Sequence, residues 1–287
     1  SPLFFGDSMH TFCKNMKKIL VTGSNGQLGS ELQSLAFAFS GFEFIFTDRS
    51  QLSFEKPETI SEFLDANAPD FIINCAAYTA VDKAESEPEL ADLINHTAVE
   101  ALAKWSFLHH AKLIHISTDY VFDGTSASPL KEDDATDPQN AYGKTKLRGE
   151  YAALKENPES IIIRTSWVYS EFGNNFVKTM LRLMKERDSL NVVEDQIGSP
   201  TYAKDLAQAI LDIISKNKWT GGIYNFSNEG EISWFDFALA IKEIAKLNCE
   251  VNGIPSSQFP TPAKRPAYSL LDKSKITQTF GVVVPDY

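Results

Sequence analysis

The 287-residue sequence has little that would suit a secreted, membrane-spanning or nucleic-acid-binding protein. It has only three cysteines, Cys13, Cys75 and Cys249, and their odd number and wide spacing predict neither a disulfide framework nor a zinc site. No apolar run approaches the length that spans a membrane. Lys and Arg total 27 against 38 Asp and Glu, and an acidic chain without a basic run is a poor partner for nucleic acids or membranes. We therefore expect a protein of the reducing cytoplasm.

Hydrophobic residues make up 43% of the chain, which is enough for a substantial core. Residues 1–15 lack the basic start and the cleavage pattern of a signal peptide. The pattern that indicates a fold begins at Met16, so we expect residues 1–15 to be an extension or the remnant of a tag.

The most informative stretch of the sequence is Lys17–Leu32, KKILVTGSNGQLGSEL. Its apolar run Ile19–Val21 predicts a buried strand, and a helical stripe of leucines begins at Leu28. Between them stand three glycines at three-residue spacing: Gly23, Gly26 and Gly29. The first permits a tight turn, the second lets the backbone approach a pyrophosphate, and the third lets helix and strand pack closely. Strand, glycine turn and helix in this order predict a dinucleotide site with the phosphates at the helix start.

Short apolar runs alternate with helical patterns along the chain, which predicts βαβ units and a doubly wound parallel sheet of the Rossmann type. The strand candidates are Ile19–Thr22, Phe44–Thr47, Phe71–Cys75, Leu113–Ser117, Ile161–Arg164, Leu190–Val193 and Ile223–Phe226. The helix candidates are Gln27–Phe37, Pro57–Ala66, Glu87–Phe107, Ala141–Lys155, Phe176–Glu186, Lys204–Lys216 and Trp234–Lys246.

The second half of the chain is richer in loops, with four prolines between 255 and 266. This loop-rich composition predicts a smaller C-terminal lobe that covers the carboxyl ends of the strands, where ligands of open α/β sheets bind. We expect the dinucleotide-binding domain to span 16–165, with 190–216 returning to it. The lobe for the substrate would then comprise 166–189 and 217–287.

Tyr142 and Lys146 stand four residues apart in a predicted helix, so their side chains share one face. A free phenol has a pKa of about 10, and a nearby ammonium lowers this pKa because it favours the phenolate. The pair could therefore donate a proton to a carbonyl oxygen. By itself the pattern also fits an ordinary surface helix, but its place after a glycine-rich turn favours catalysis.

Further polar or small residues follow two of the predicted strands. A hydroxyl at Thr118 can hydrogen-bond a reacting carbonyl or the phenol, and Asp119 could contact hydroxyls of a substrate. A simple strand-to-loop cap is the alternative for Thr118. Ala76 and Ala77 would let a dinucleotide lie flat across the sheet, an arrangement that is equally compatible with tight core packing.

Together these stretches resemble the dTDP-4-dehydrorhamnose reductase family of extended short-chain dehydrogenases. The resemblance runs in family order from about Met16 to about Leu271. Its pieces are GSNGQLG, NCAAYTAVDKAESEPE, STDYVFDG, YGKTKLRGE, RTSWVY, GNNFVKTML, DQIGSPT, SWFDFA and TPAKRP. The glycine turn and the Tyr-Lys pair are shared by the whole superfamily, whereas AAYTAVDKAE, RTSWVY and DQIGSPT are far more particular to this family.

The resemblance implies reduction of the C4 ketone of dTDP-4-dehydro-β-L-rhamnose by NADPH or NADH, the last step of dTDP-rhamnose synthesis. It implies that Tyr142 is the proton donor, that Lys146 tunes the phenol and holds the nicotinamide ribose, and that Thr118 assists. Implied cofactor contacts are Gly26, Gln27, Leu28, Asp48, Ala76, Ala77 and Tyr78. Implied substrate contacts are Thr118, Asp119 and Trp167.

Other implied features leave alternatives open. Arg265 is a candidate partner for the diphosphate, because a guanidinium matches phosphate oxygens. The alternative is that Arg265 is only a solvated charge on a loop. Asn174 and Asn175 are candidates to face the substrate, with helix capping as the alternative. Asp48 favours the free ribose hydroxyl of NADH and Arg49 the 2′-phosphate of NADPH, so the preference stays open.

The assembly is also open. Some members of the family are described as metal-bridged dimers, but the sequence shows no recognisable metal cluster and Glu31 alone does not indicate one. We expect a monomer or a homodimer.

Two other functions fit parts of the pattern. A sugar-nucleotide epimerase shares the glycine turn and the Tyr-Lys pair but needs a second acid–base pair. His115 is the one extra titratable group near Thr118, and its mid-strand position favours a structural role. A regulatory subunit could bind dinucleotide without catalysis, but Thr118, Tyr142 and Lys146 are all present.

Overall fold

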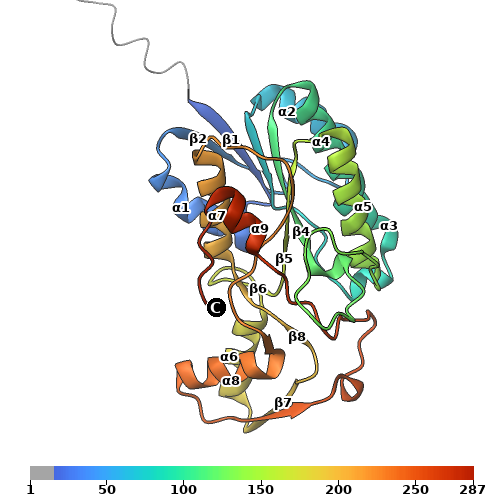
Figure 1. Cartoon of the computed structure of the whole chain (residues 1–287), viewed down its shortest axis with the longest axis vertical. Helices are drawn as coiled ribbons and strands as arrows, with labels where there is room; N and C mark the ends of the chain where they lie inside the picture. Colours follow the sequence, from blue (N-terminus) through green and yellow to red (C-terminus); the bar gives the residue numbers. More distant parts are fainter. Residues whose placement is uncertain (1–15) are drawn as a thin grey trace, which may run out of the picture.

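The structure is a computed structural model that describes residues 16–287 of the chain. The interpretation of residues 1–15 as an extension or tag remnant lies outside the described residues. The described part has a large sheet flanked by helices and, at one end of it, a smaller group of helices and short strands (Figure 1).

Six parallel strands form the large sheet in the order β10-β5-β4-β3-β1-β2. They are β1 (Lys17–Thr22), β2 (Phe42–Phe46), β3 (Phe71–Asn74), β4 (Lys112–Thr118), β5 (Ile161–Thr165) and β10 (Gly222–Asn225). The chain passes from β1 to its neighbour β2 and then crosses to β3 on the other side of β1. Ligands of open α/β sheets bind beside such a reversal, at the carboxyl ends of the strands. The predicted doubly wound parallel sheet is confirmed.

Helices cover both faces of this sheet (Figure 1). One layer is α1 (Gln27–Leu35), α7 (Ala203–Ser215) and α9 (Ser274–Phe280), and the other is α2 (Ile60–Asn67), α4 (Ala98–Leu108) and α5 (Ala141–Glu156). On β1, Ile19 and Val21 belong to the core beneath α1 and α7, whereas Leu20 belongs to the core beneath α2 and α4. A parallel strand that is covered on both faces needs apolar residues at consecutive positions, which explains this run.

The smaller lobe is built on α6 (Phe176–Glu186) and α8 (Trp234–Ala245), which pack together at the lower end of Figure 1. Beside them β7 (Ser189–Val193) pairs in parallel with β12 (Glu250–Ile254). Two short pairs complete the lobe: β6 (Val168–Tyr169) with β9 (Thr201–Tyr202), and β8 (Ile197–Gly198) with β11 (Ile232–Ser233). Its core includes Met180, Met184, Leu190, Phe237 and Ile241.

The predicted boundaries between the two parts need correction. The return of 190–216 to the sheet domain is wrong for its first strand, because β7 pairs with β12 in the smaller lobe. Leu190 and Val192 are buried whereas Asn191 is exposed, so β7 has one covered face, and a strand of the large sheet needs two. The assignment of all of 217–287 to the lobe is also wrong, because β10 extends the large sheet and α9 packs against its core.

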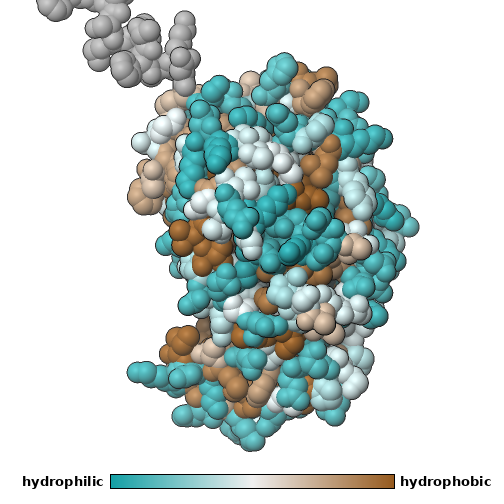
Figure 2. All heavy atoms as spheres, in the orientation of Figure 1, coloured by the Kyte–Doolittle hydropathy of each residue, from teal (hydrophilic) through white to brown (hydrophobic). Residues whose placement is uncertain are grey.

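On the face shown in Figure 2, polar residues predominate and apolar residues form separate patches. Large exposed apolar side chains are scattered, as at Phe37, Phe107 and Ile244, which is ordinary for a protein surface. Among residues 16–287, no helix combines the length and the apolar character needed to cross a bilayer.

Candidate active site

Gly23 in the turn after β1 and Gly29 in the first turn of α1 have no room for a side chain. Gly23 has a φ of 61°, and a Cβ added there would lie 2.7 Å from the backbone nitrogen of Ala76. A Cβ at Gly29 would lie 2.4 Å from the carbonyl oxygen of Gly23. At Gly26 the nearest atom to an added Cβ is that same oxygen, at 3.4 Å, so the chain itself leaves space there. Space beside the second glycine suits the close approach of a phosphate.

The N-terminus of α1 offers backbone donors to such a phosphate. Gly26 precedes the helix, and no side chain among residues 16–287 caps its first turn. The first N–H groups of a helix lack partners within the helix and favour anions. Leu28 is buried in the core beneath α1, whereas the Gln27 side chain reaches the smaller lobe, where its Oε1 accepts a hydrogen bond from Asn175 Nδ2 at 3.1 Å.

The segment Ala76–Tyr78, predicted to line the cofactor groove, lies directly against the glycine turn. Thr22 Oγ1 accepts hydrogen bonds from the backbone nitrogens of Cys75 (3.1 Å) and Ala76 (3.3 Å), which ties the end of β3 to β1. All three residues of the segment are partly buried. The residues proposed for the pyrophosphate and for the groove are therefore adjacent.

Asn95 links this segment to α5 by hydrogen bonds, and it is not among the site residues predicted from the sequence. It lies in a π-helical turn, Leu93–Thr97, between α3 (Pro88–Asp92) and α4. Asn95 Oδ1 accepts a hydrogen bond from the Tyr78 backbone nitrogen at 2.8 Å, and Nδ2 donates to Thr145 Oγ1 at 3.1 Å. Turns of this kind are frequent at functional sites. A polar residue inside a helical pattern was the only available signal.

Asp48, predicted to bind the adenosine ribose, follows β2 next to the glycine turn. Its carboxylate accepts hydrogen bonds from Asn25 Nδ2 at 3.1 Å and from the Ser50 backbone nitrogen at 2.8 Å. Hydrogen bonds from Ser50 hold the pKa of Asp48 below its ordinary value, and the bond from the Ser50 hydroxyl is the largest cause. Asp48 is therefore charged at neutral pH. Arg49 is exposed beside it.

The first turn of α5 holds Tyr142 in place. Asn140 caps the helix by accepting a hydrogen bond from the Gly143 backbone nitrogen at 2.7 Å, and its Nδ2 donates to the Lys264 carbonyl at 2.9 Å. The ring of Tyr120 meets that of Tyr142 edge-on, with ring centroids 5.8 Å apart. The cap and the aromatic contact together fix the phenol at the start of the helix.

The structure brings the three predicted catalytic residues together beside the ends of β3 and β4. Thr118 Oγ1 donates to Asp119 Oδ1 at 3.1 Å and also lies within hydrogen-bond reach of the Tyr142 phenol. Lys146 is buried one turn along α5, and its ammonium donates to the Ile116 carbonyl at 2.6 Å. Thr118 and Tyr142 therefore lie together, and the ammonium of Lys146 reaches the same strand two residues before Thr118.

The pKa of Tyr142 is raised to about 12, chiefly by burial and further by the charge of Asp119, while the hydrogen bond with Thr118 opposes the rise. The ammonium of Lys146 is bonded to the Ile116 carbonyl instead of the phenol. Burial dominates the pKa of Tyr142 in this structure, so the tuning of the phenol by Lys146 stays a prediction. The phenol keeps its proton at neutral pH, which is the state that a proton donor needs.

Burial is also the largest influence on the pKa of Lys146. Burial lowers its pKa to about 8, and the negative charge of Glu150 opposes this change. Lys146 is therefore mostly charged at neutral pH and loses its charge as the pH rises through about 8.

Asp119 is a buried carboxyl at the centre of the site. Its Oδ2 and the hydroxyl of Ser269 are both buried without a hydrogen-bond partner of ordinary geometry among residues 16–287. Burial raises the pKa of Asp119 to about 7, and hydrogen-bonding groups on Ser269 and Thr118 oppose the rise. A buried acceptor without such a partner suits a hydroxyl of a bound ligand.

The raised pKa of Asp119 predicts a measurable effect on stability. The folded pKa of about 7 exceeds the ordinary value of 3.8, so this group stabilises the fold fully below pH 3.8 and loses its contribution as the pH rises through about 7. A shift of about 3 units corresponds to about 4 kcal/mol. We expect the unfolding free energy of Asp119→Asn, relative to wild type, to be higher at pH 8 than at pH 4 by up to that amount. Denaturant unfolding at both pH values measures this, and identical pH dependence of the two proteins would contradict it.

Trp167 and Asn175 lie in the smaller lobe. Trp167 has a φ of 48° and stacks on Trp234, with ring centroids 3.7 Å apart. Asn175 caps α6 by accepting a hydrogen bond from the Lys178 backbone nitrogen at 3.1 Å. The structure thus assigns Asn175 the capping role and also a contact with Gln27 of the glycine turn. Its contact with a substrate stays a prediction.

Arg265, the candidate for the diphosphate, is paired with Asp82. Arg265 Nη1 donates to Asp82 Oδ1 at 2.6 Å and Nη2 donates to Oδ2 at 3.1 Å. The pKa of Asp82 is held below its ordinary value, and the hydrogen bond from Arg265 is the largest cause. The pair joins the segment after β3 to the C-terminal part of the chain, and a diphosphate would have to share or displace Asp82. The role of Arg265 toward a substrate therefore stays a prediction.

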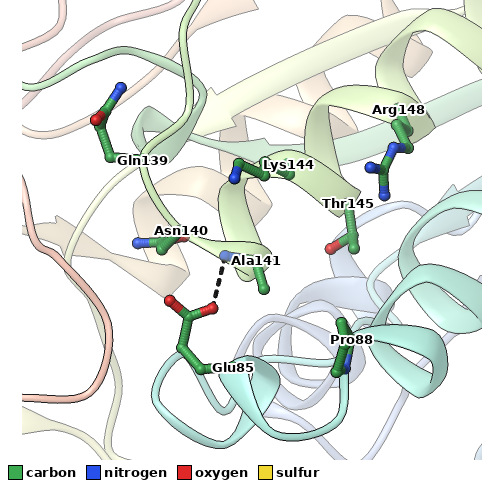
Figure 3. A pocket seen from close by; sticks show the side chains of 8 residues that line it. All are labelled: Glu85, Pro88, Gln139, Asn140, Ala141, Lys144, Thr145 and Arg148. Carbon is green, nitrogen blue, oxygen red and sulfur yellow. Dashed lines mark hydrogen bonds between the residues drawn. The ribbon is translucent and has the colours of Figure 1, made fainter.

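A separate pocket of about 210 Å³ lies beside the first turns of α5 (Figure 3). Glu85 points at the start of the helix and accepts a hydrogen bond from the Ala141 backbone nitrogen at 3.1 Å. Lys144 and Arg148 also line it, and by helical spacing they face away from Tyr142. None of the predicted site residues lines this pocket.

Glu31 on α1 is buried, and its Oε2 has no hydrogen-bond partner among residues 16–287. Burial raises its pKa, Glu171 and Asp205 raise it further, and Lys204 opposes them. Within the described part of the chain, no three His, Cys, Asp or Glu side chains gather closely enough to hold a metal ion.

The fold and the site together define a dinucleotide-dependent reductase of the short-chain dehydrogenase class. A family model described as the RmlD substrate binding domain matches residues 16–287. A protein of Aggregatibacter actinomycetemcomitans named dTDP-4-dehydrorhamnose reductase is 44% identical over 282 residues, covering 95% of this chain and 96% of the relative. The chain belongs to the dTDP-4-dehydrorhamnose reductase family, which confirms the resemblance found in the sequence.

Other relatives agree. The dTDP-4-dehydrorhamnose reductase of Escherichia coli K12 is 45% identical, covering 94% of each chain. A crystal structure of such a reductase from Clostridium acetobutylicum matches with a TM-score of 0.90 at 41% identity, covering 94% of this chain and 95% of that one. A reductase of Bacillus anthracis, solved in complex with NADP, matches with a TM-score of 0.89 at 38% identity, covering 95% of both chains.

Proposed function

We propose that this protein reduces the C4 ketone of dTDP-4-dehydro-β-L-rhamnose to the alcohol of dTDP-β-L-rhamnose, with NADPH or NADH as the reductant. The observation that carries the proposal is the convergence of Tyr142, Thr118 and Lys146 beside the glycine turn. The relatives named for this reaction match this chain over nearly its whole length.

The dinucleotide, when bound, supplies the hydride for the ketone carbon. The free space at Gly26 and the uncapped start of α1 fit its pyrophosphate. We assign Asp48 to the adenosine ribose, the segment Ala76–Tyr78 to the groove, and Lys146 to the nicotinamide ribose. The NADP complex of the Bacillus anthracis relative supports a dinucleotide at this site.

Tyr142 donates the proton in this proposal. Burial raises its pKa to about 12, so the phenol is protonated at neutral pH. The alkoxide that forms at the reduced carbon is a stronger base than a phenolate, so the transfer is favourable. Thr118 hydrogen-bonds the same oxygen, and the ammonium of Lys146 stabilises the phenolate left behind.

The proposal also includes contacts with the substrate. We assign the buried Oδ2 of Asp119 to a sugar hydroxyl, because it is an acceptor without a partner of ordinary geometry among residues 16–287. We assign Trp167 and Asn175 to the sugar-nucleotide side of the site, and Arg265 to the diphosphate in exchange with Asp82.

The experiment that tests the function is dinucleotide oxidation with a panel of 4-keto nucleotide sugars that differ in base and sugar. We expect dTDP-4-dehydro-β-L-rhamnose to give the highest kcat/KM and dTDP-β-L-rhamnose as product. Tight dinucleotide binding without oxidation by any ketone would favour a regulatory subunit. Deuterium from heavy water at C3 or C5 of the sugar would favour an epimerase. His115 is buried, and burial lowers its pKa well below the usual range, so the imidazole is neutral. It therefore offers no second acid–base group for that reaction.

Asp48 gives a prediction on cofactor preference. Its carboxylate is charged and hydrogen-bonded beside the glycine turn, where it would bind the free ribose hydroxyls of NADH and repel the 2′-phosphate of NADPH. We expect Asp48→Ala to raise the ratio of kcat/KM for NADPH over NADH by about tenfold. Steady-state kinetics with both cofactors measure the ratio. An unchanged or lowered ratio would remove Asp48 from the ribose site.

We also propose that the protein works in the cytoplasm as a monomer or homodimer. The free thiols of Cys75 and Cys249 suit a reducing compartment. Sedimentation of the purified full chain, with and without divalent cations, distinguishes the two assembly states.

A further inference from the structure

Behind the catalytic residues lies a buried ion pair with no role in the proposed mechanism. Glu150 on α5 and Arg164 on β5 have exposed side-chain fractions of 0% and 2%. Arg164 Nη2 donates to Glu150 Oε1 at 2.7 Å and Nε donates to Oε2 at 3.0 Å, so the contact is bidentate. The remaining nitrogen, Nη1, donates to the Glu132 carbonyl at 3.2 Å, and the guanidinium lies over the ring of Phe122.

Stability does not explain why this pair is present. Removing two charges from water is costly, and replacing a buried ion pair by apolar residues of similar size is often neutral or stabilising. The pair lies inside the protein between α5 and β5, so both charges are removed from water. The carboxylate of Glu150 has partners besides Arg164, and these indicate its role.

Glu150 contacts the elements that carry the catalytic groups. Its Oε2 accepts a hydrogen bond from Ser117 Oγ at 2.5 Å, and Ser117 immediately precedes Thr118 at the end of β4. Glu150 also lies on α5 four residues after Lys146, on the same helix face. One carboxylate thus joins β4, β5 and the catalytic helix.

We propose that Glu150, held by Arg164, is a positioning residue of the reaction: it fixes Thr118 of β4 against α5 and presents a negative charge to the ammonium of Lys146. The inference deepens the proposed function and rests on it, since the groups that it positions are the proposed catalytic ones. The pair is not among the predicted site residues, although a carboxylate on the helix face shared by Tyr142 and Lys146 indicates a buried charge that needs a partner.

The charged and titratable groups around Lys146 support this role. Burial lowers the pKa of Lys146 to about 8, and the charge of Glu150 is the main influence that opposes it. Burial raises the pKa of the Cys75 thiol, which therefore stays neutral, and burial lowers the pKa of His115, which stays neutral as well. Arg164 lies beyond Glu150 and partly offsets its charge.

The test is Glu150→Gln in the full-length protein. Gln keeps the shape, its one carbonyl oxygen can accept a hydrogen bond from Arg164, and its amide nitrogen can donate to the Ser117 hydroxyl, but it carries no charge. In wild type, turnover should fall as the pH rises through about 8, when Lys146 loses its proton. In the variant we expect this fall about 1 pH unit lower and a turnover number lower by roughly tenfold, with little change in KM. Wild-type turnover and an unshifted pH profile would overturn the proposal.

A second variant covers the case in which Glu150→Gln does not fold because Arg164 is left buried and unpaired. Glu150→Met combined with Arg164→Met removes both charges and should fold with a melting temperature near that of wild type. If the pair only stabilises the fold, this variant regains wild-type turnover and pH profile, which would overturn the proposal. Lowered turnover and a displaced profile support it.

Two further variants separate position from charge. Ser117→Ala removes one hydrogen bond and keeps the charge, so we expect lower turnover with an unshifted pH profile. Glu156→Gln, in the last turn of the same helix, is the matched control and should change neither the turnover nor the pH profile. A shifted profile in Ser117→Ala, or lowered turnover in Glu156→Gln, would contradict the assignment.

A readout without substrate keeps this inference distinct from the proposed function. The side chain of Lys146 can be titrated by NMR in the ligand-free protein after ¹³C labelling of lysine. We expect its titration midpoint to fall in Glu150→Gln relative to wild type, and an unchanged midpoint would overturn the proposal. Failure of wild type to reduce any ketone would instead refute the proposed function and leave this titration valid.

Discussion

Replacing Tyr142 by Phe is expected to lower the turnover number for ketone reduction by about 10²–10⁴-fold, the usual contribution of a positioned proton donor. The variant loses only the hydroxyl, which the structure places within reach of Thr118 and keeps protonated through a pKa of about 12. Dinucleotide affinity and melting temperature should stay near those of wild type, because the ring contact with Tyr120 is kept. Turnover is measured as dinucleotide oxidation with cofactor and substrate saturating.

Tyr151→Phe is the matched control for this experiment. Tyr151 lies on the same helix, but its side chain is 60% exposed and far from the start of α5. We expect its turnover number to equal that of wild type. Turnover of Tyr142→Phe within tenfold of wild type would show that another group donates the proton.

Gly29→Ala is expected to weaken dinucleotide binding by at least about 100-fold. Its Cβ would lie 2.4 Å from the Gly23 carbonyl oxygen and 2.6 Å from the Ser24 Cα, both backbone atoms of the phosphate-binding turn. Because backbone cannot yield as a flexible side chain does, the turn or α1 must shift, and the N–H groups at the start of α1 move with it. Titration of NADPH fluorescence measures the dissociation constant.

Gly41→Ala is the control for this variant. An added Cβ at Gly41 meets no atom within 4 Å, so both affinity and melting temperature should be unchanged. A Gly29→Ala protein that folds and binds NADPH as wild type does would refute the assignment of this turn to the pyrophosphate.

Much of the fold could be predicted because strongly periodic segments carry their own signal. The helix predicted over Phe176–Glu186 has those bounds in the structure, and the strand predicted over Leu113–Ser117 lies within β4. The two-residue strands β6, β8, β9 and β11 are too short to show any alternation. For β7 the strand itself was predictable, but its partner β12 was not, since pairing depends on tertiary contacts.

Tyr142 and Lys146 could be found because their spacing along one helix brings them to one face, and Thr118 because it ends a predicted strand. Their electrostatics could not be found in this way, since the pKa of Tyr142 depends on burial by segments distant in sequence. Partners at long range were also hidden: Arg265 and Asp82 are 183 residues apart, and Asn175 and Gln27 are 148 apart. Sequence periodicity carries no information at such separations.

The most direct measurement of the central claim follows the hydride itself. NADPH with deuterium at the transferable position of the nicotinamide is oxidised by the wild-type protein with dTDP-4-dehydro-β-L-rhamnose, and the product is analysed by NMR. The account predicts one deuterium at C4 of the sugar in dTDP-β-L-rhamnose, and none at C3 or C5 when the reaction runs in ordinary water or in heavy water. A product without deuterium at C4, or one that gains solvent deuterium at C3 or C5, would contradict it.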